Sequence, residues 1–216
     1  MRANTSSSTS PSSGRLLAAA TEAFAERGFH GTTTRDISAR AGMSPAAMYA
    51  HHRSKEELLY AISLHGHQRV LSAIQEASAQ GVTPTERLSR VAYAFGAWHA
   101  EGHVRARVVN YELGSLSPEH RAEVTALRRG IDTVFRSIVA AGIAAGEFDA
   151  PDASMTAVSL ISLGIDISRW YNPQGSGRPT TWPPTTATPS CAWWAPSTES
   201  SRSRISDCRG WTGAIY

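Results

Sequence analysis

The segment covering residues 32–58 constrains the fold more than any other part of the chain. Thr33 and Asp36 stand three residues apart and have the form of a capping box, in which a hydroxyl accepts from the free N–H groups at a helix start. Gly42 then supplies the backbone freedom with which a helix ends and turns sharply. The pattern predicts a short helix closed by a tight glycine turn.

A second helix start follows at once. Ser44 offers a side-chain oxygen cap, and Pro45 suits the first helical position because an N–H there would have no partner in the helix. Ser54 and Glu57 form a further capping box directly after this second short helix. Two short helices joined by a glycine turn at this spacing indicate a helix-turn-helix, whose second helix lies in a major groove of DNA.

Further motifs surround this pattern. They are a helix-forming stretch at Leu16–Arg27, a Gly28-Phe29 break, a Thr-Thr pair, an Asp-Ile helix, an Ala-Gly-x-Ser turn and a Tyr-x-His…Ser-Lys-Glu-Glu-Leu run. Together they resemble the N-terminal DNA-binding domain of TetR-type transcriptional regulators over residues 14–70. One departure is His52, which stands where that family usually has a packed aromatic residue.

The resemblance implies a homodimer that binds double-stranded DNA through residues 14–70. The residues that we expect at the DNA are Thr33, Thr34, Arg35, Ser44, Pro45, Ala46, Ala47, Tyr49, His51 and Lys55. Arg35 is the candidate for reading a guanine edge, and Lys55 with the N–H groups of its helix start is the candidate for holding a phosphate. For Tyr49 and His51 the alternative to a DNA contact is ordinary helix packing. For Lys55 the alternative is a charge that is exposed to solvent.

The charge of the chain is concentrated at its N-terminal end. Residues 1–70 hold eight basic and five acidic residues, and this excess equals the net charge of +3 of all 216 residues. Such a charge does not by itself indicate a nucleic-acid partner. Residues 1–13 are rich in Ser and Thr without the apolar core of a signal peptide, which predicts a disordered arm. No apolar run reaches the ~18 residues of a membrane span, and we expect a soluble, cytoplasmic protein with no membrane partner.

Helical periodicity without a strand signal continues after residue 58. Apolar residues at helical spacing predict a long helix to Ile74, further helices around 88–99, 104–111 and 118–138, and a last one over 156–170. Turns are expected at 81–84 and 142–151. The sequence therefore predicts an all-α chain, with a three-helix helix-turn-helix domain over 14–70 and a helical effector-binding and dimerisation bundle over 71–171.

The region from residue 105 to 175 carries a second, less specific resemblance. Its motifs are Tyr111-Glu112-Leu113, Gly146-Glu147-Phe148 and the run from Ser168 to Pro173. They resemble a branch of TetR-type regulators of fatty-acid and steroid breakdown, which implies an acyl-CoA or another large apolar effector. Bulky apolar groups mixed with a few polar ones are typical of small-molecule cavities. On this ground the effector candidates are Phe95, Trp98, Asn110, Tyr111 and Phe135, with plain core packing as the alternative.

The sequence holds no constellation typical of an enzyme. It has no G-x-S-x-G elbow, no P-loop and no H-E-x-x-H motif, so we expect no catalytic residue, no metal and no cofactor. His65 and His67 stand on different helix faces and are interpreted as a surface pair. The predicted function is a ligand-responsive transcriptional repressor that binds a palindromic operator as a homodimer. The competing class is a helical protein-interaction module without DNA binding.

The composition changes after residue 171. Residues 172–216 hold six of the eleven prolines, four of the six tryptophans and both cysteines, and no helical period continues there. A disordered, irregular tail is the simpler interpretation, although disordered segments are poor in aromatic residues. The alternative is translation out of frame after about Gly175, because a shifted frame yields apolar residues at helical spacing where the TetR family has its last helix.

Overall fold

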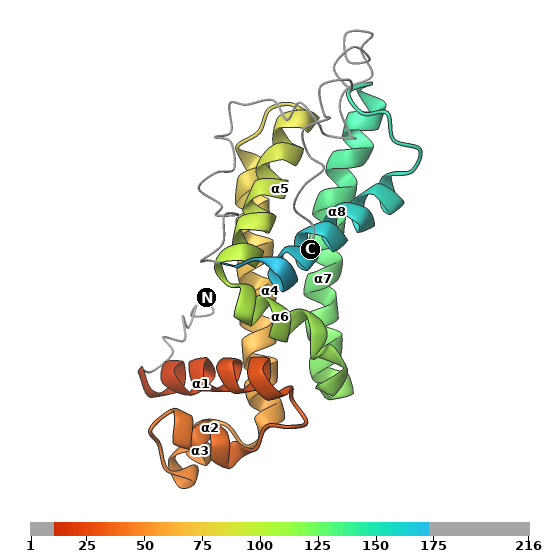
Figure 1. Cartoon of the computed structure of the whole chain (residues 1–216). Coiled ribbons are helices and arrows are strands. Elements are labelled where there is room, and N and C mark those ends of the chain that lie inside the picture. The colour runs from red at the N-terminus through yellow and green to blue at the C-terminus, as the bar shows by residue number, and fades with distance from the viewer. Residues whose placement is uncertain (1–10, 173–216) are drawn as a thin grey trace, which may run out of the picture. The chain divides into compact units, whose positions relative to one another are not determined.

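The computed structural model describes residues 11–172, and every regular element in this range is helical. The elements are α1 (Pro11–Arg27), α2 (Thr34–Arg40), α3 (Pro45–His51), α4 (Lys55–Ala79), α5 (Pro84–Glu101), α6 (His103–Tyr111), the 3₁₀ turn η1 (Leu113–Ser115), α7 (Pro118–Ala144) and α8 (Ala153–Trp170), and Figure 1 labels the α-helices. The all-α prediction is confirmed. Both interpretations of the tail after Asn172 concern residues outside the described range.

The described residues divide into two compact units. The head unit comprises the residues up to Arg69 together with Gly102–Arg128, and the body unit comprises Val70–Glu101 together with the residues from Arg129 on. Neither unit is continuous in sequence, because α4 and α7 each begin in the head unit and end in the body unit. The sequence predicted a DNA-binding domain over 14–70 and an effector-binding domain over 71–171. This assignment of functions to two consecutive segments remains a prediction.

The helix-turn-helix forms at the residues that the sequence indicates. The predicted capping box at the start of α2 is present, and Ser44 caps α3 with Pro45 at a first-turn position. Gly42 has a φ of 65°, a left-handed conformation that glycine adopts without steric cost. Next to it, the Met43 N–H donates to the Ser38 carbonyl at 2.9 Å and closes the turn. The predicted local geometry of this segment is confirmed.

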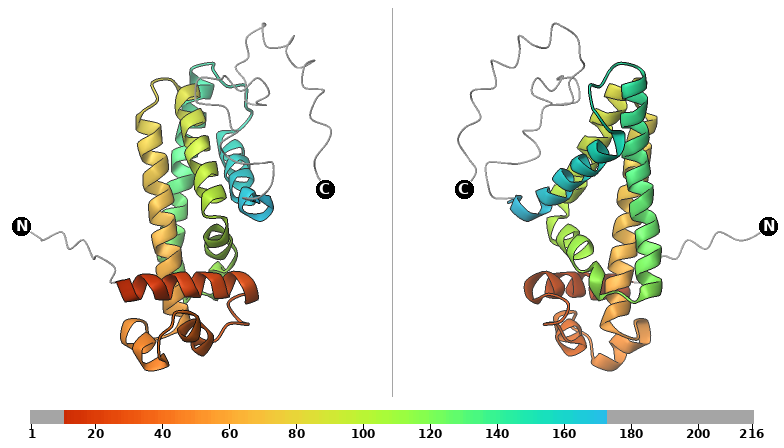
Figure 2. Two further views of the ribbon diagram at one scale, coloured as in Figure 1. Left: turned by 60° about the vertical axis from the view of Figure 1, so that its left-hand side comes forward. Right: turned by 90° about the vertical axis from the view of Figure 1, so that its right-hand side faces the viewer.

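An apolar core holds the head unit together. Its most deeply buried side chains come from α1 to α4 and are Leu16, Phe24, Ile37, Met48, Leu58 and Leu59, each at most 2% exposed. The helix α6 packs against α1, as Figure 2 shows. At the end of α6, the Glu112 carboxylate accepts from the Phe29 N–H at 3.3 Å. The loop between α1 and α2 is thereby tied to a segment that lies 83 residues further along the chain.

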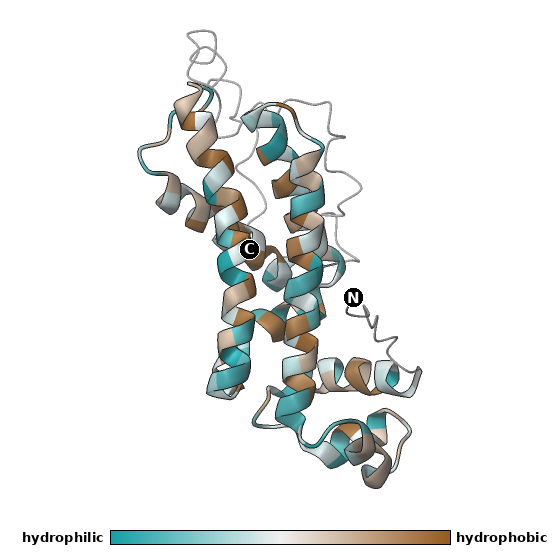
Figure 3. Cartoon of the chain, turned by 180° about the vertical axis from the view of Figure 1, so that it is seen from behind, coloured by the Kyte–Doolittle hydropathy of each residue, from teal (hydrophilic) through white to brown (hydrophobic). Residues whose placement is uncertain are grey.

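The body unit is built around an apolar core of its own. Its buried members are Val70, Ile74, Leu88, Val91, Phe95, Ile131, Phe135, Ile138, Val139, Phe148, Ala157 and Leu160. Figure 3 shows apolar and polar residues alternating along the long helices that supply them. The helix α8 packs against α5. Gly164 permits this close approach, because a Cβ at that position would lie 2.4 Å from the Phe95 ring.

One face of α8 stays exposed in the single chain. Met155, Val158, Leu163 and Trp170 are 66%, 49%, 59% and 62% exposed. Val158 and Trp170 are among the apolar residues that stand at helical spacing in this segment, and within one chain both lie on the exposed face of α8. The reason is that Gly164 and Ala157 present the opposite face of α8 to the core. No helix among residues 11–172 is both long and apolar enough to cross a membrane.

Candidate nucleic-acid interface

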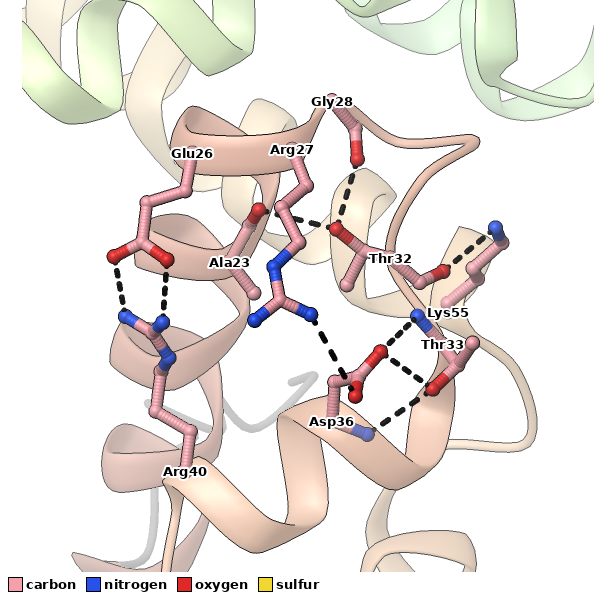
Figure 4. A network of polar contacts seen from close by, with 9 residues as sticks. All are labelled: Ala23, Glu26, Arg27, Gly28, Thr32, Thr33, Asp36, Arg40 and Lys55. Carbon is pink, nitrogen blue, oxygen red and sulfur yellow. Dashed lines mark hydrogen bonds and ion pairs between the residues drawn. The ribbon is translucent and has the colours of Figure 1, made fainter.

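The start of α2 is fixed by Thr33. Its hydroxyl accepts from the Asp36 N–H at 3.1 Å and donates to the Asp36 carboxylate at 2.7 Å, and its own N–H donates to the same carboxylate at 3.0 Å (Figure 4). These hydrogen bonds, together with the nearby charges of Arg27 and Arg35, lower the pKa of Asp36. The cap therefore stays ionised at neutral pH and sets the direction of the α2 start.

The helix α3 is anchored on one side and open on the other. Met48 is fully buried, whereas Ser44, Pro45 and Ala46 are exposed and Ala47 is partly exposed. The Ser44 hydroxyl accepts from the Ala47 N–H at 3.1 Å. Because the first turn of α3 carries only small side chains on this face, a groove wall can come close to the α3 backbone there. This is the geometry that a recognition helix needs.

Polar groups of α2 and α3 meet at the rim of this face. Thr34 Oγ1 and the Tyr49 hydroxyl lie 3.2 Å apart, and Tyr49 is half exposed. Hydroxyl groups at such a position can donate to phosphate oxygens and fix the register on a duplex. The structure thus brings Thr34 and Tyr49 together, as a shared phosphate contact requires.

Two arginines of α2 differ in their availability. Arg40 is held by carboxylates of α1. It donates to Glu26 at 2.7 Å (Figure 4) and to Glu22 at 3.2 Å, and the hydrogen bond to Glu26 lowers the pKa of that carboxyl. Arg35 is exposed, and no ion pair holds it within the described part of the chain. Only Arg35 can therefore reach a base edge without first breaking an ion pair.

Lys55 has a role that the sequence did not indicate. Its Nζ donates to the carbonyls of Phe29 at 2.8 Å and Thr32 at 2.9 Å, and it lies 4.4 Å from the centroid of the Phe29 ring. An ammonium group has three donors, so these contacts leave one for a phosphate. Lys55 thus braces the loop between α1 and α2, and its predicted phosphate contact stays a prediction. No sequence pattern could reveal this brace, since its partners lie 26 and 23 residues away.

Thr32 supports the same loop from inside. It is 1% exposed, and its hydroxyl lies 3.0 Å from the Ala23 carbonyl and 2.8 Å from the Gly28 carbonyl. Figure 4 draws both contacts. A threonine in a Thr-Thr-Thr run gives no sequence signal of which member is buried. The contact holds the end of α1 against the start of α2.

The two histidines after α3 lie in different surroundings. His51 is exposed, which favours the phosphate contact over the packing alternative. His52 is partly buried, and burial lowers its pKa, with the charge of Glu57 opposing. His52 therefore packs as a neutral ring at the position where the TetR-type domain usually has an aromatic residue.

The effector candidates fall into both units. In the body unit, Phe95 and Phe135 are 3% and 1% exposed, their ring centroids lie 5.3 Å apart, and Trp98 packs against the same core. In the head unit, Tyr111 is 53% exposed, and Asn110 takes part in a polar cluster described below. The burial of the two phenylalanines is that of core residues.

Comparison with known proteins identifies the family to which the chain belongs. A helix-turn-helix head joined to a helical body is the architecture of a DNA-binding transcriptional regulator. Residues 16–62 match the family described as bacterial regulatory proteins, tetR family, and residues 81–181 match the tetracyclin repressor-like C-terminal domain. The chain belongs to the TetR family, whose members are transcriptional regulators and not enzymes.

Several solved structures are similar over most of the chain. A TetR-family regulatory protein from Rhodococcus RHA1 is 46% identical, with 79% of this chain and 90% of that chain covered and a TM-score of 0.75. The TetR-family regulator PfmR from Thermus thermophilus is 32% identical, with 76% and 90% covered and a TM-score of 0.71. Both cover the head and body helices together.

Relatives of known role include both directions of regulation. The transcriptional activator FasR of Mycolicibacterium smegmatis is 29% identical over 73% of this chain and 71% of its own length. The transcriptional repressor KstR2 of the same organism is 28% identical over 74% and 79%. The similarity therefore supports transcriptional regulation without choosing between activation and repression.

Proposed function

We propose that this protein is a ligand-responsive repressor that binds a palindromic operator as a homodimer. The observation that carries the proposal is the open face of α3. The helix begins at the Ser44 cap, its first turn exposes small side chains, and Met48 on the opposite side is buried in the core. In this proposal Arg35 reads a guanine edge. The residues that surround it on the DNA are Thr33, Thr34, Ser44, Pro45, Ala46, Ala47, Tyr49, His51 and the remaining donor of Lys55.

The homodimer is supported by the exposed face of α8. Met155, Val158, Leu163 and Trp170 form an apolar stripe along it, and soluble proteins seldom leave such a stripe open to water. A second copy placed about a twofold axis would cover it, and its head would then read the second half-site. Half-sites one or more helical turns apart, about 34–36 Å per turn, are expected.

The effector proposal is supported by the roles of relatives. FasR is similar over most of the chain, and a protein named fatty acid metabolism regulator from Bacillus subtilis is 25% identical over 62% of it. A structure of the ketosteroid transcriptional regulator KstR2 of Mycobacterium tuberculosis matches with 25% identity and a TM-score of 0.70. We therefore propose a large apolar effector such as an acyl-CoA, with contacts to Phe95, Trp98, Asn110, Tyr111 and Phe135.

The dimer is tested by Leu163→Glu. Because Leu163 is 59% exposed in one chain, the variant should keep its fold while a charge on the α8 face prevents association. Sedimentation should then give half the wild-type mass, and DNA affinity should fall by about 100-fold because one head holds only half of the phosphate contacts. Val82→Glu, at an apolar position that is 88% exposed outside α8, is the matched control. A Leu163→Glu protein that remains dimeric would remove α8 from the interface.

Repression is tested with a reporter gene that is controlled by the DNA upstream of this protein's own gene. Expression should fall when the protein is present and recover when decanoyl-CoA accumulates. A rise in expression with the protein alone would make it an activator instead.

A further inference from the structure

A polar cluster lies inside the head unit where α4, α6 and α7 meet. Arg128 of α7 donates from Nη1 to Asn110 Oδ1 of α6 at 3.0 Å, and the same nitrogen lies 3.3 Å from His67 Nε2 of α4. Asn110 is itself oriented, because its Nδ2 donates to the Ala106 carbonyl at 2.8 Å. The guanidinium is thus held in one position by two neutral groups.

His67 supplies no charge to this cluster. It is 3% exposed, and its Nδ1 lies 2.8 Å from the Ser63 carbonyl, so Nδ1 carries the proton and Nε2 accepts from Arg128. Burial, reinforced by the charge of Arg128, lowers the pKa of His67 to about 4. The ring is therefore neutral at physiological pH and cannot balance or repel an ion by its own charge.

The charge of Arg128 has no counterpart. Within residues 11–172 it forms no ion pair with a carboxylate, although its side chain is only partly exposed. Because the guanidinium is partly removed from water, its burial lowers the pKa of Arg128. A charge in such surroundings is costly unless an opposite charge accompanies it.

Donors in the cluster also lack acceptors. A guanidinium has five N–H groups in a planar fork, and the contacts of Arg128 within the described residues involve Nη1 alone. The Ser63 hydroxyl, one turn before His67, is buried and has no hydrogen-bond partner among the same residues. Buried polar groups are normally paired, so the unpaired Ser63 hydroxyl is unusual. The Nε and Nη2 groups of Arg128 are not buried in this way, so an anion from outside the chain can reach them.

We propose that Arg128 binds an oxyanion of the effector, with Asn110 as the positioning residue. The free edge of the guanidinium, Nε with Nη2, matches the two oxygens of a carboxylate or phosphate in a bidentate pair. The inference rests on the proposed ligand response and specifies its chemistry, since an uncharged sterol or hydrocarbon would leave Arg128 unpaired. A free fatty acid and a CoA thioester both supply an oxyanion, and the probes below separate them.

The test compares binding of decanoate, decanoyl-CoA and methyl decanoate to the full chain by calorimetry. The wild type should bind one or both anionic probes at least 10-fold more tightly than the ester. Arg128→Met should lose this preference and leave binding of the ester unchanged. Arg129→Met, at the exposed next position of α7, is the matched control and should behave as the wild type. Binding of decanoate identifies a carboxylate, and binding of decanoyl-CoA alone identifies a phosphate.

A second readout keeps the test valid if the substitution affects folding. Without ligand, Arg128→Met should melt a few degrees higher than the wild type, roughly 3 °C, because an unpaired buried charge has been removed. Arg128→Lys keeps the charge but loses the fork, and it should lower affinity for the anionic probe without this rise. Equal binding of anion and ester by the wild type, or equal anion binding by Arg128→Met, would overturn the proposal. Operator binding without any probe tests the proposed function separately.

Discussion

Both units of the chain have an apolar core, and they differ in the contacts that are added to it. In the head unit several polar groups that are far apart in sequence join the core, such as Lys55 with the Phe29 carbonyl and His120 with the Glu56 carboxylate at 2.9 Å. The body unit depends on a continuous apolar core, in which α8 approaches the Phe95 ring at Gly164.

This difference predicts how each unit fails. Apolar packing responds to side-chain volume and is nearly independent of pH, whereas polar contacts respond to protonation and to the loss of a single partner. The body unit should therefore be sensitive to truncation of large side chains. The head unit should be sensitive to acid and to replacement of its buried polar groups.

Phe135→Ala is expected to have the largest effect on stability. The ring is 1% exposed and packs edge-to-face on Phe95, so its loss should lower the free energy of unfolding by about 3–5 kcal/mol in a urea titration. Arg129→Ala, on the exposed side of the same helix, should change it by less than about 0.5 kcal/mol. A cost for Phe135→Ala below about 1 kcal/mol would contradict core packing and favour the proposed effector contact.

Acid should weaken the head unit through His67. The pKa of His67 falls from 6.5 in the unfolded chain to about 4 in the fold, so the unfolded chain binds the extra proton between these values. Stability is thus complete above pH 6.5 and falls as the pH drops towards 4, by at most about 3 kcal/mol. His67→Gln cannot titrate and should lose less stability between pH 7 and 4.5 than the wild type, measured as urea midpoints. Equal acid sensitivity of the two proteins would show that His67 is not responsible.

Lys55→Met should have a smaller effect on stability. It removes two hydrogen bonds to the α1–α2 loop but keeps most of the packing on Phe29, which predicts a loss of about 1–2 kcal/mol. Arg53→Met, two positions earlier and exposed, is the control and should cost almost nothing. The salt dependence of DNA binding separates the two roles of Lys55. A slope reduced by about one indicates an added phosphate contact, and an unchanged slope leaves only the structural brace.

The predictions from sequence held where the contacts are local. Thr33 with Asp36, Ser44 with Ala47 and Ser54 with Glu57 are each three residues apart, and all three hydrogen bonds are present. A cap is decided by residue types within one turn of helix, so the sequence contains what is needed to predict it. The same holds for the helices themselves, whose apolar spacing marks the buried face.

The predictions missed contacts between distant segments. His67 was expected to form a surface pair with His65, and this is wrong for His67, which is buried while His65 is exposed. Its partner Arg128 lies 61 residues away, so nothing in the local pattern distinguishes the two histidines. The brace by Lys55 was missed for the same reason. Burial of a polar residue depends on which helices meet, and that is set by the packing of the whole unit.

The central claim is that the open face of α3 binds DNA, and Ala46→Glu tests it most directly. The exposed position should accept glutamate without loss of melting temperature, whereas a carboxylate facing phosphates should repel them. Fluorescence anisotropy with the DNA upstream of this protein's own gene should show affinity lowered by about 100-fold, or roughly 3 kcal/mol. Ala126→Glu, at an exposed position of α7 in the head unit, should bind as the wild type. An Ala46→Glu protein that binds this DNA with wild-type affinity would contradict the assignment of α3 to the groove.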